Sequence, residues 1–134
     1  INQIEMQKKV VKAWELFAQN EIEKSLMMMI SAADLEDASE KNPVTPGQLL
    51  PAREMLGDLL LEMNKPKEAL KQYELTLEIN PNRLNALFGA GRSAELIGDK
   101  EKTVFYFTAL LKNNKSSEPN NERIAHAVEV TTKI

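Results

Sequence analysis

The feature that most constrains the fold is a spacing of 34 residues between matching positions in the middle of the chain. Residues 50–83 align with residues 84–117 without a gap, and three kinds of position match: an interior glycine, an aromatic residue and a turn. The matches are Gly57 with Gly91, Tyr73 with Phe107, and Asn64-Lys65 with Gly98-Asp99. A glycine inside a helix costs about 0.5–1 kcal/mol relative to alanine, so two at one spacing need a compensating contact. The spacing therefore indicates two copies of one structural unit.

The spacing of apolar residues predicts helices and no strands. In residues 66–79 the apolar positions recur every three to four residues on one side, and charged residues occupy the other. Prolines and glycines fall between such segments, where they end or begin helices. The predicted helices are 2–19, 21–40, 49–63, 66–79, 82–97, 100–113 and 119–133. The chain is therefore predicted to be all-α.

The repeat also carries a recognisable residue pattern. Its first copy has Leu56, Gly57, Ala69, Tyr73 and Pro81 at the positions that a 34-residue helical repeat conserves. On these residues the chain resembles the tetratricopeptide repeat (TPR) proteins. The resemblance implies an α-solenoid of three TPR-like helical hairpins plus a C-terminal capping helix, folded as a single domain over residues 1–134.

Within that domain, the alignment divides the chain into five parts. An N-terminal unit fits the repeat at a larger offset, with Ala13, Asn20, Ser25 and Met29 in the glycine, turn, small-residue and aromatic positions. The parts are a degenerate repeat (6–37), a loop insertion (38–49), the best repeat (50–83), a looser repeat (84–117) and the capping helix (118–134). Because residue 1 is Ile rather than Met, we expect the chain to be a piece of a longer protein.

The repeat also predicts specific contacts. We expect Gly57 to pack near Ala69 and Gly91 near Thr103, which would let the paired helices of a hairpin touch. Tyr73 and Phe107 would then fill the wedge between successive hairpins. Of the three adjacent methionines at 27–29, Met29 is expected in the core.

Composition excludes several classes of function. The chain has no cysteine and one histidine, which removes thiolate catalysis, disulfide scaffolds and cysteine- or histidine-rich metal sites. We expect His126 to be a solvated surface residue, and we expect no catalytic activity and no cofactor or metal. Acidic residues outnumber basic ones by 20 to 17, and no apolar run approaches the roughly 20 residues of a spanning helix. The expected partners therefore include neither nucleic acid nor the membrane interior.

Two charged patterns leave alternatives open. Carboxylates at Asp34, Glu36, Asp37 and Glu40 have helical spacing and could hold a hard cation, although a solvated helix face is favoured. Lys8, Lys9 and Lys12 beside Trp14 and Phe17 form a basic amphipathic helix that could rest on a membrane or a partner. A helix with its apolar side in the core is favoured.

The TPR resemblance implies a binding groove, because the first helix of each hairpin lines a concave surface in such proteins. The predicted groove residues are Glu54, Asp58, Leu61, Glu62, Asn85, Phe88, Arg92, Glu95 and Leu96. Some TPR proteins grip a C-terminal carboxylate with a basic clamp. Here Glu54, Asp58 and Gly89 take the corresponding positions, and acidic groups would repel such a ligand.

The groove residues suggest a non-catalytic protein- or peptide-binding scaffold. We expect Asp58 to pair with Arg92, leaving Glu54, Glu62 and Glu95 as an acidic rim around an apolar centre anchored by Phe88. This pattern suits a basic-amphipathic protein segment. In the alternatives, Phe88 packs against a neighbouring helix of its own chain, or the domain is a purely structural spacer or terminal cap of a longer helical repeat array.

Overall fold

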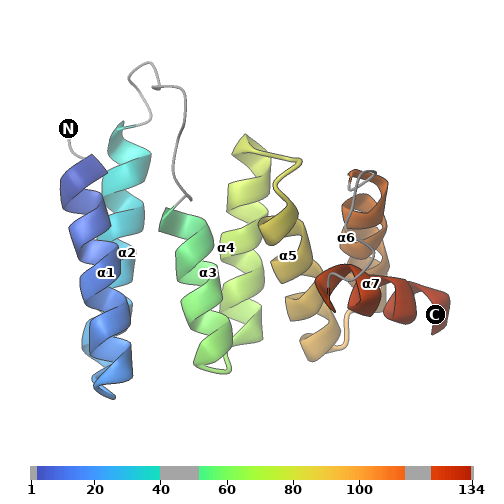
Figure 1. Ribbon diagram of the computed structural model, residues 1–134, viewed down its shortest axis with the longest axis horizontal. Helices are drawn as coiled ribbons and strands as arrows, with labels where there is room; N and C mark the ends of the chain where they lie inside the picture. Colours follow the sequence, from blue (N-terminus) through green and yellow to red (C-terminus); the bar gives the residue numbers. More distant parts are fainter. Residues whose placement is uncertain (1–2, 40–51, 114–121, 134) are drawn as a thin grey trace.

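A computed structural model describes residues 3–39, 52–113 and 122–133, which form helices joined by short turns (Figure 1). The helices are α1 (Gln3–Ala18), α2 (Ile22–Ser39), α3 (Ala52–Glu62), α4 (Pro66–Ile79), α5 (Leu84–Ile97), α6 (Lys100–Asn113) and α7 (Glu122–Lys133). The all-α prediction is confirmed, and the helices lie within a few residues of the predicted segments. Of the predicted insertion, residues 40–49 lie outside the described residues, as do residues 114–121.

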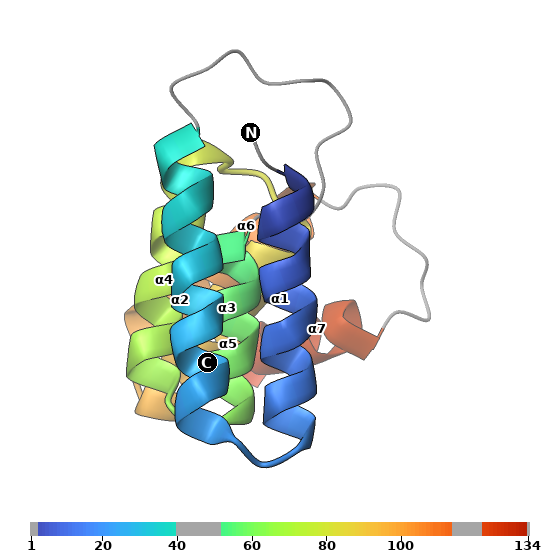
Figure 2. The same cartoon turned by 90° about the vertical axis from the view of Figure 1, so that its left-hand side faces the viewer.

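The helices stack as a row of three hairpins in two layers. Helices α1, α3 and α5 form one layer and α2, α4 and α6 the other (Figures 1 and 2). Helix α3 contacts both α1 and α5, and the second helix of each hairpin contacts the next first helix. We call the surface formed by α1, α3 and α5 the inner face. Helix α7 lies on this side and crosses the end of the row, in contact with α6.

The three hairpin turns close in the same way. Each places one residue in the left-handed region: Asn20 at φ 65°, Asn64 at φ 62° and Gly98 at φ 83°. The amide of the following residue then reaches back five residues to a carbonyl oxygen. These bonds are Glu21 to Leu16 (2.8 Å), Lys65 to Leu60 (2.8 Å) and Asp99 to Ala94 (2.9 Å). The positions that the alignment matched as turns thus have one backbone geometry.

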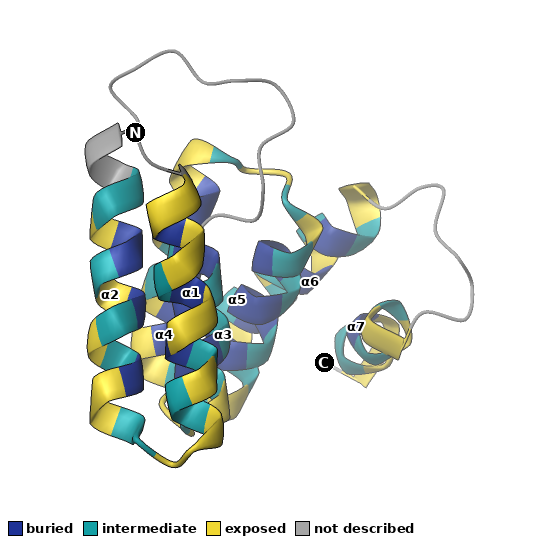
Figure 3. Cartoon of the chain, turned by 60° about the vertical axis from the view of Figure 1, so that its left-hand side comes forward, coloured by how far each residue is buried: buried dark blue, intermediate teal, exposed yellow. Residues whose placement is uncertain are grey.

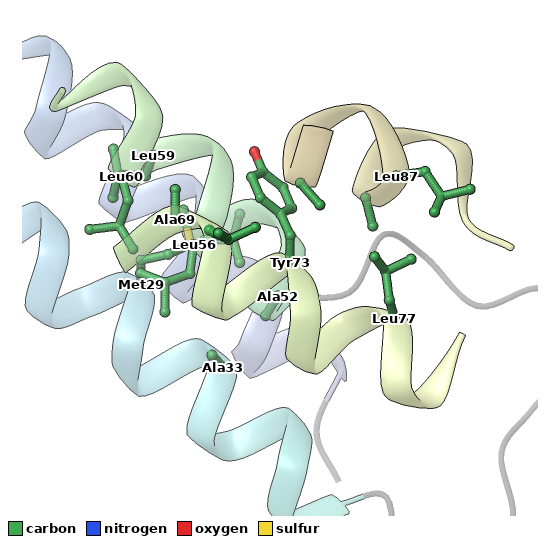
Figure 4. Packing of buried hydrophobic residues seen from close by; sticks show 14 of the residues in the cluster. Met29, Ala33, Ala52, Leu56, Leu59, Leu60, Ala69, Tyr73, Leu77 and Leu87 are labelled. Carbon is green, nitrogen blue, oxygen red and sulfur yellow. The ribbon is translucent and has the colours of Figure 1, made fainter. Parts of the chain in front are cut away.

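The core is built around one large side chain from the second helix of each hairpin. Met29, Tyr73 and Phe107 are all buried, which confirms the prediction for Met29. Figure 4 shows the Tyr73 ring extending from α4 toward α3 and α5. A Cβ on Gly57 would lie 2.9 Å from the Cζ of Tyr73, and a Cβ on Gly91 would overlap Phe107. The atoms nearest to both positions belong to aromatic rings, so the glycines make room for Tyr73 and Phe107.

The first hairpin packs one apolar side into the core and exposes lysines on its outward side. Figure 3 shows exposed residues along the outward side of α1 and α2. Lys8 and Lys12 are exposed, while Trp14 and Phe17 are half-buried and pack against the core. This matches the interpretation of the basic amphipathic segment as a core helix. None of the described helices is long and apolar enough to cross a membrane.

Candidate binding site on the inner face

The N-terminal end of α3 carries a buried ion pair. The Glu54 side chain has 0% exposure and accepts bonds from Arg83 Nε at 2.6 Å and Arg83 Nη2 at 3.1 Å. Asn85 Nδ2 donates a third bond to Glu54 at 2.9 Å. The prediction of Glu54 as an exposed rim residue was therefore wrong. Arg83 precedes α5, and the close packing of α5 against α3 brings it onto the Glu54 carboxylate.

Asp58 lies one turn further along α3 and is half-buried. The Tyr73 hydroxyl donates to Asp58 Oδ1 at 2.5 Å, and Asn85 Nδ2 lies 3.5 Å from the same oxygen. Burial raises the pKa of the Asp58 carboxyl, and the nearby Glu54 charge adds to this, against the opposing effects of Tyr73, Asn85 and Arg123. Burial and the Asp58 charge likewise raise the pKa of Tyr73. Tyr73 thus joins the core to the inner face.

Arg92 and Glu95 form a second charged group, on α5. Arg92 Nη1 lies 3.1 Å from Glu95 Oε1, so the predicted pairing of Arg92 with Asp58 was wrong. Arg92 reaches along its own helix, because residues three apart are neighbours on a helix surface. Glu95 also contacts His126 Nε2 at 2.7 Å. Burial of the Glu95 carboxyl opposes its ionisation, but the bonds and charges of His126 and Arg92 outweigh burial and lower its pKa.

His126 connects α7 to the inner face and is not the solvated residue that the sequence suggested. Its side chain is 34% exposed. Its ring packs edge-on against Phe88 and Phe107, with centroid separations of 6.2 Å and 5.8 Å. The crossing of α7 over α5 and α6 causes this burial, and helical periodicity within residues 119–133 carries no information about that crossing.

Phe88 is half-buried and lies beneath α7. Its ring is 5.8 Å from that of Phe107, and the Arg123 guanidinium lies 5.1 Å from its centroid. The same guanidinium donates a hydrogen bond to Asn85 Oδ1. The chain's own packing therefore engages Phe88, as the alternative interpretation anticipated. Of the other predicted groove residues, Leu61 is half-buried, Glu62 is exposed and Leu96 is 47% exposed.

Sequence reasoning missed three residues of this site: Arg83, Arg123 and His126. The spacing of three residues between Arg123 and His126 places both on one side of α7, and this was the available signal. Nothing local pointed to Arg83, because its partner Glu54 lies 29 residues earlier in the chain.

The acidic run at the end of α2 forms structural contacts. Asp34 is exposed, with Oδ1 3.4 Å from Arg53 Nη2, and Glu36 Oε1 accepts a 2.9 Å bond from the Ala52 amide at the start of α3. The Asp37 side chain and Glu40 lie outside the described residues. Across the described parts of the chain, no group of three acidic or histidine side chains could hold a metal ion.

A cleft of about 320 Å³ lies where α5 ends, α6 begins and α7 passes. His126 and Glu95 line it together with side chains of both charges, including Lys100, Glu129 and Lys133. His126 therefore belongs both to the lining of this cleft and to the contact between α7 and Glu95 of α5.

Comparisons with known proteins place this geometry among helical repeats. No family model matches the chain. A TPR repeat-containing protein of Methanocaldococcus jannaschii is 39% identical over 66 residues, which cover 48% of this chain and 12% of that protein. The chain thus spans about an eighth of the length of that relative.

Solved structures share the fold at low sequence identity. PcrH from Pseudomonas aeruginosa has a TM-score of 0.72 at 11% identity, covering 99% of this chain and 93% of PcrH. The Sgt2 TPR domain from Aspergillus fumigatus has a TM-score of 0.75 at 12% identity, covering 98% of this chain and 79% of the Sgt2 chain. PcrH in complex with the chaperone binding region of PopB has a TM-score of 0.73 at 11% identity, covering 97% of each chain.

Proposed function

Because this chain is a tetratricopeptide-repeat protein, we propose that its inner face binds a segment of another protein and that it acts as a non-catalytic scaffold. The observation that carries the proposal is the half-buried group of Asp58, Asn85 and Phe88 on α3 and α5, which Arg123 of α7 contacts in this structure. A half-buried carboxylate, an amide and an aromatic ring together can orient a ligand by hydrogen bonds and hold it by apolar contact. The structure of PcrH with a region of PopB supports the proposal by fold alone.

A packing role for the one histidine favours binding over catalysis. Nucleophilic catalysis by Ser or Thr requires a base held against the hydroxyl. The imidazole of His126 contacts Glu95 and lies against Phe88 and Phe107, which fixes α7 to α5 and α6. We therefore propose that the site recognises a partner without chemical change.

The charges that remain on the inner face favour a basic-amphipathic partner. Arg83 compensates Glu54, and Arg92 compensates Glu95, which also contacts His126 Nε2. Asp58 receives its hydrogen bonds from Tyr73 and Asn85, which are neutral, and Glu62 is exposed. Glu62 is thus available to a ligand, and Asp58 becomes available to a ligand cation that replaces Arg123, whose charge acts on it.

The test is a peptide library presented to the full chain, with binding compared between charge variants of the two layers. Glu62→Lys reverses an exposed charge on α3, and Glu78→Lys makes the same change on α4, in the other layer. We expect basic-amphipathic peptides to bind at micromolar affinity and to lose about tenfold in Glu62→Lys alone. Hits that are acidic at their C-terminus, or that respond equally to both variants, would contradict the assignment.

One observation favours the second candidate, in which the domain is a spacer or terminal unit of a longer array. Ile4, Val11 and Met27 on the first hairpin are all exposed. A further hairpin stacked on α1 and α2 would cover apolar residues of this kind. If no peptide binds and these residues become protected in the parent protein, the spacer role is supported.

A further inference from the structure

We propose that Asp58, Asn85 and Phe88 form a subsite for a guanidinium group, which Arg123 of α7 fills in this structure and which an arginine of the bound segment takes. The inference rests on the proposed function and names the ligand group that the site would select.

The orientation of the Asn85 amide is the first step. Asn85 Nδ2 points at two carboxylates, with Glu54 Oε2 at 2.9 Å and Asp58 Oδ1 at 3.5 Å. An amide nitrogen donates and an amide oxygen accepts, so these acids fix which way the group faces. Asn85 Oδ1 is left directed at the surface as an acceptor, and the Arg123 guanidinium donates to it.

The charge of the cluster is the second step. The cluster contains two carboxylates, Glu54 and Asp58, and the cation Arg83. Arg83 forms its ion pair with Glu54. Tyr73 and Asn85, which donate hydrogen bonds to Asp58, are neutral. The Arg123 charge favours the ionised form of Asp58, whose pKa burial raises. A second cation at this spot therefore balances the cluster.

The Phe88 ring is the third step, because it distinguishes guanidinium from ammonium. A guanidinium is planar and can lie over an aromatic face while its edge donates hydrogen bonds in the same plane. Arg123 does both, with its Cζ 5.1 Å from the Phe88 centroid and its edge on Asn85. A lysine ammonium is a compact, strongly hydrated charge without this geometry.

Exchange with an incoming arginine is feasible because Arg123 is an exposed residue in the first turn of α7. Contacts of exposed charges are weakened by water and salt. His126, one turn later, holds α7 to Glu95 independently of Arg123. The helix can thus stay docked while its arginine is replaced by a ligand's.

The experiment removes the Arg123 side chain from the subsite and measures the binding of a small arginine derivative in its place. The full chain with Arg123→Ala is titrated with N-acetyl-arginine amide and with N-acetyl-lysine amide at fixed ionic strength, and NMR follows the Asn85 side-chain amide. We expect saturable shifts with the arginine probe, about fivefold tighter than with the lysine probe or with the unaltered chain. Adding Asp58→Asn should remove the preference. Arg92→Ala is the control, because it removes an arginine that pairs with Glu95 and leaves Arg123 in place. This variant should bind the probe as the unaltered chain does.

The chemical shifts of the His126 ring protons verify that α7 remains docked, because the Phe88 and Phe107 rings shift these signals. Arg123→Gln serves as a second variant that also removes the guanidinium. Equal shifts with both probes, or no effect of Asp58→Asn, would overturn the subsite. Replacing arginine by citrulline in library peptides separates the two proposals. If peptides bind equally well with citrulline, the scaffold function stands and the subsite is wrong. If the probe binds while no peptide does, the subsite stands and the inner-face function is wrong.

Discussion

The ring of Tyr73 occupies the space that a side chain at Gly89 would need. A Cβ built on Gly89 overlaps that ring, and one on Gly57 would lie 2.9 Å from its Cζ. One aromatic residue of α4 thus sets the approach of both α3 and α5. Its hydroxyl then reaches Asp58 on the inner face. The core packing and the candidate site therefore share a residue.

The first prediction concerns this contact. Gly89→Ala should destabilise the chain by about 1–3 kcal/mol, because it overpacks the helix against Tyr73. In a Tyr73→Leu background the cost should disappear, since the better helix propensity of alanine remains and the clash does not. Denaturant unfolding of the single and double variants measures both. Equal costs in the two backgrounds would show that the ring is not the cause.

The second prediction concerns the buried ion pair. Arg83→Ala should cost about 2–4 kcal/mol, because it leaves the Glu54 carboxylate buried with only Asn85 to compensate it. Adding Glu54→Leu should recover much of the loss, since no buried charge then remains. A double-mutant cycle by chemical denaturation checks this. Strict additivity of the two changes would contradict the pairing.

The third prediction compares two fully buried serines. Ser93 Oγ has no hydrogen-bond partner among the described residues, whereas Ser25 Oγ donates to the Ala13 carbonyl at 2.7 Å. Ser93→Ala should therefore raise the free energy of unfolding by about 1 kcal/mol, and Ser25→Ala should lower it by a similar amount. Thermal melts of both variants give the comparison. A loss of stability in both would point to an undetected partner of Ser93.

The fourth prediction is a pair of opposite pH dependences. The pKa of Glu95 is lowered in the folded chain, so its stabilising effect is present above its usual pKa and is lost as the pH falls through the folded value. The pKa of Asp58 is raised, so its stabilising effect is present in acid and is lost as the pH rises through the folded value.

Melting curves between about pH 7 and pH 3 test both signs. At neutral pH, Glu95→Gln should lower the melting temperature and Asp58→Asn should raise it. Both differences should shrink toward zero in acid, where the native carboxyls are protonated. A difference of the same sign for the two variants would contradict the assigned environments.

The fifth prediction concerns α7. Deleting residues 114–134 should uncover Phe88 and Phe107 and remove the contact of His126 with Glu95. Phe105 is already 67% exposed, so it contributes little to the change. The shortened chain should melt earlier and self-associate, because it exposes a contiguous apolar surface. Sedimentation velocity measures the association. A monomer of unchanged stability would show that α7 is a tail.

The amino-acid sequence by itself determined the helices, the turns and the residues that fill the wedges between hairpins. Apolar periodicity is a property of a single helix, and the left-handed turns at Asn64 and Gly98 depend on local backbone preferences. Both can therefore be predicted from neighbouring residues in the sequence. The matched positions of Tyr73 and Phe107 are buried for the same reason: each repeat presents the same apolar face.

Only the tertiary structure decided the charges and contacts of the inner face. A repeat shows which positions are equivalent, but not the distance and angle at which helices meet. Glu54 is buried because Arg83, far along the chain, is packed onto it, and Arg92 turns to Glu95 rather than Asp58. Helix α7 lies outside the two aligned repeats. Its crossing angle, which brings Arg123 and His126 onto Phe88, therefore depends on its packing against α5 and α6.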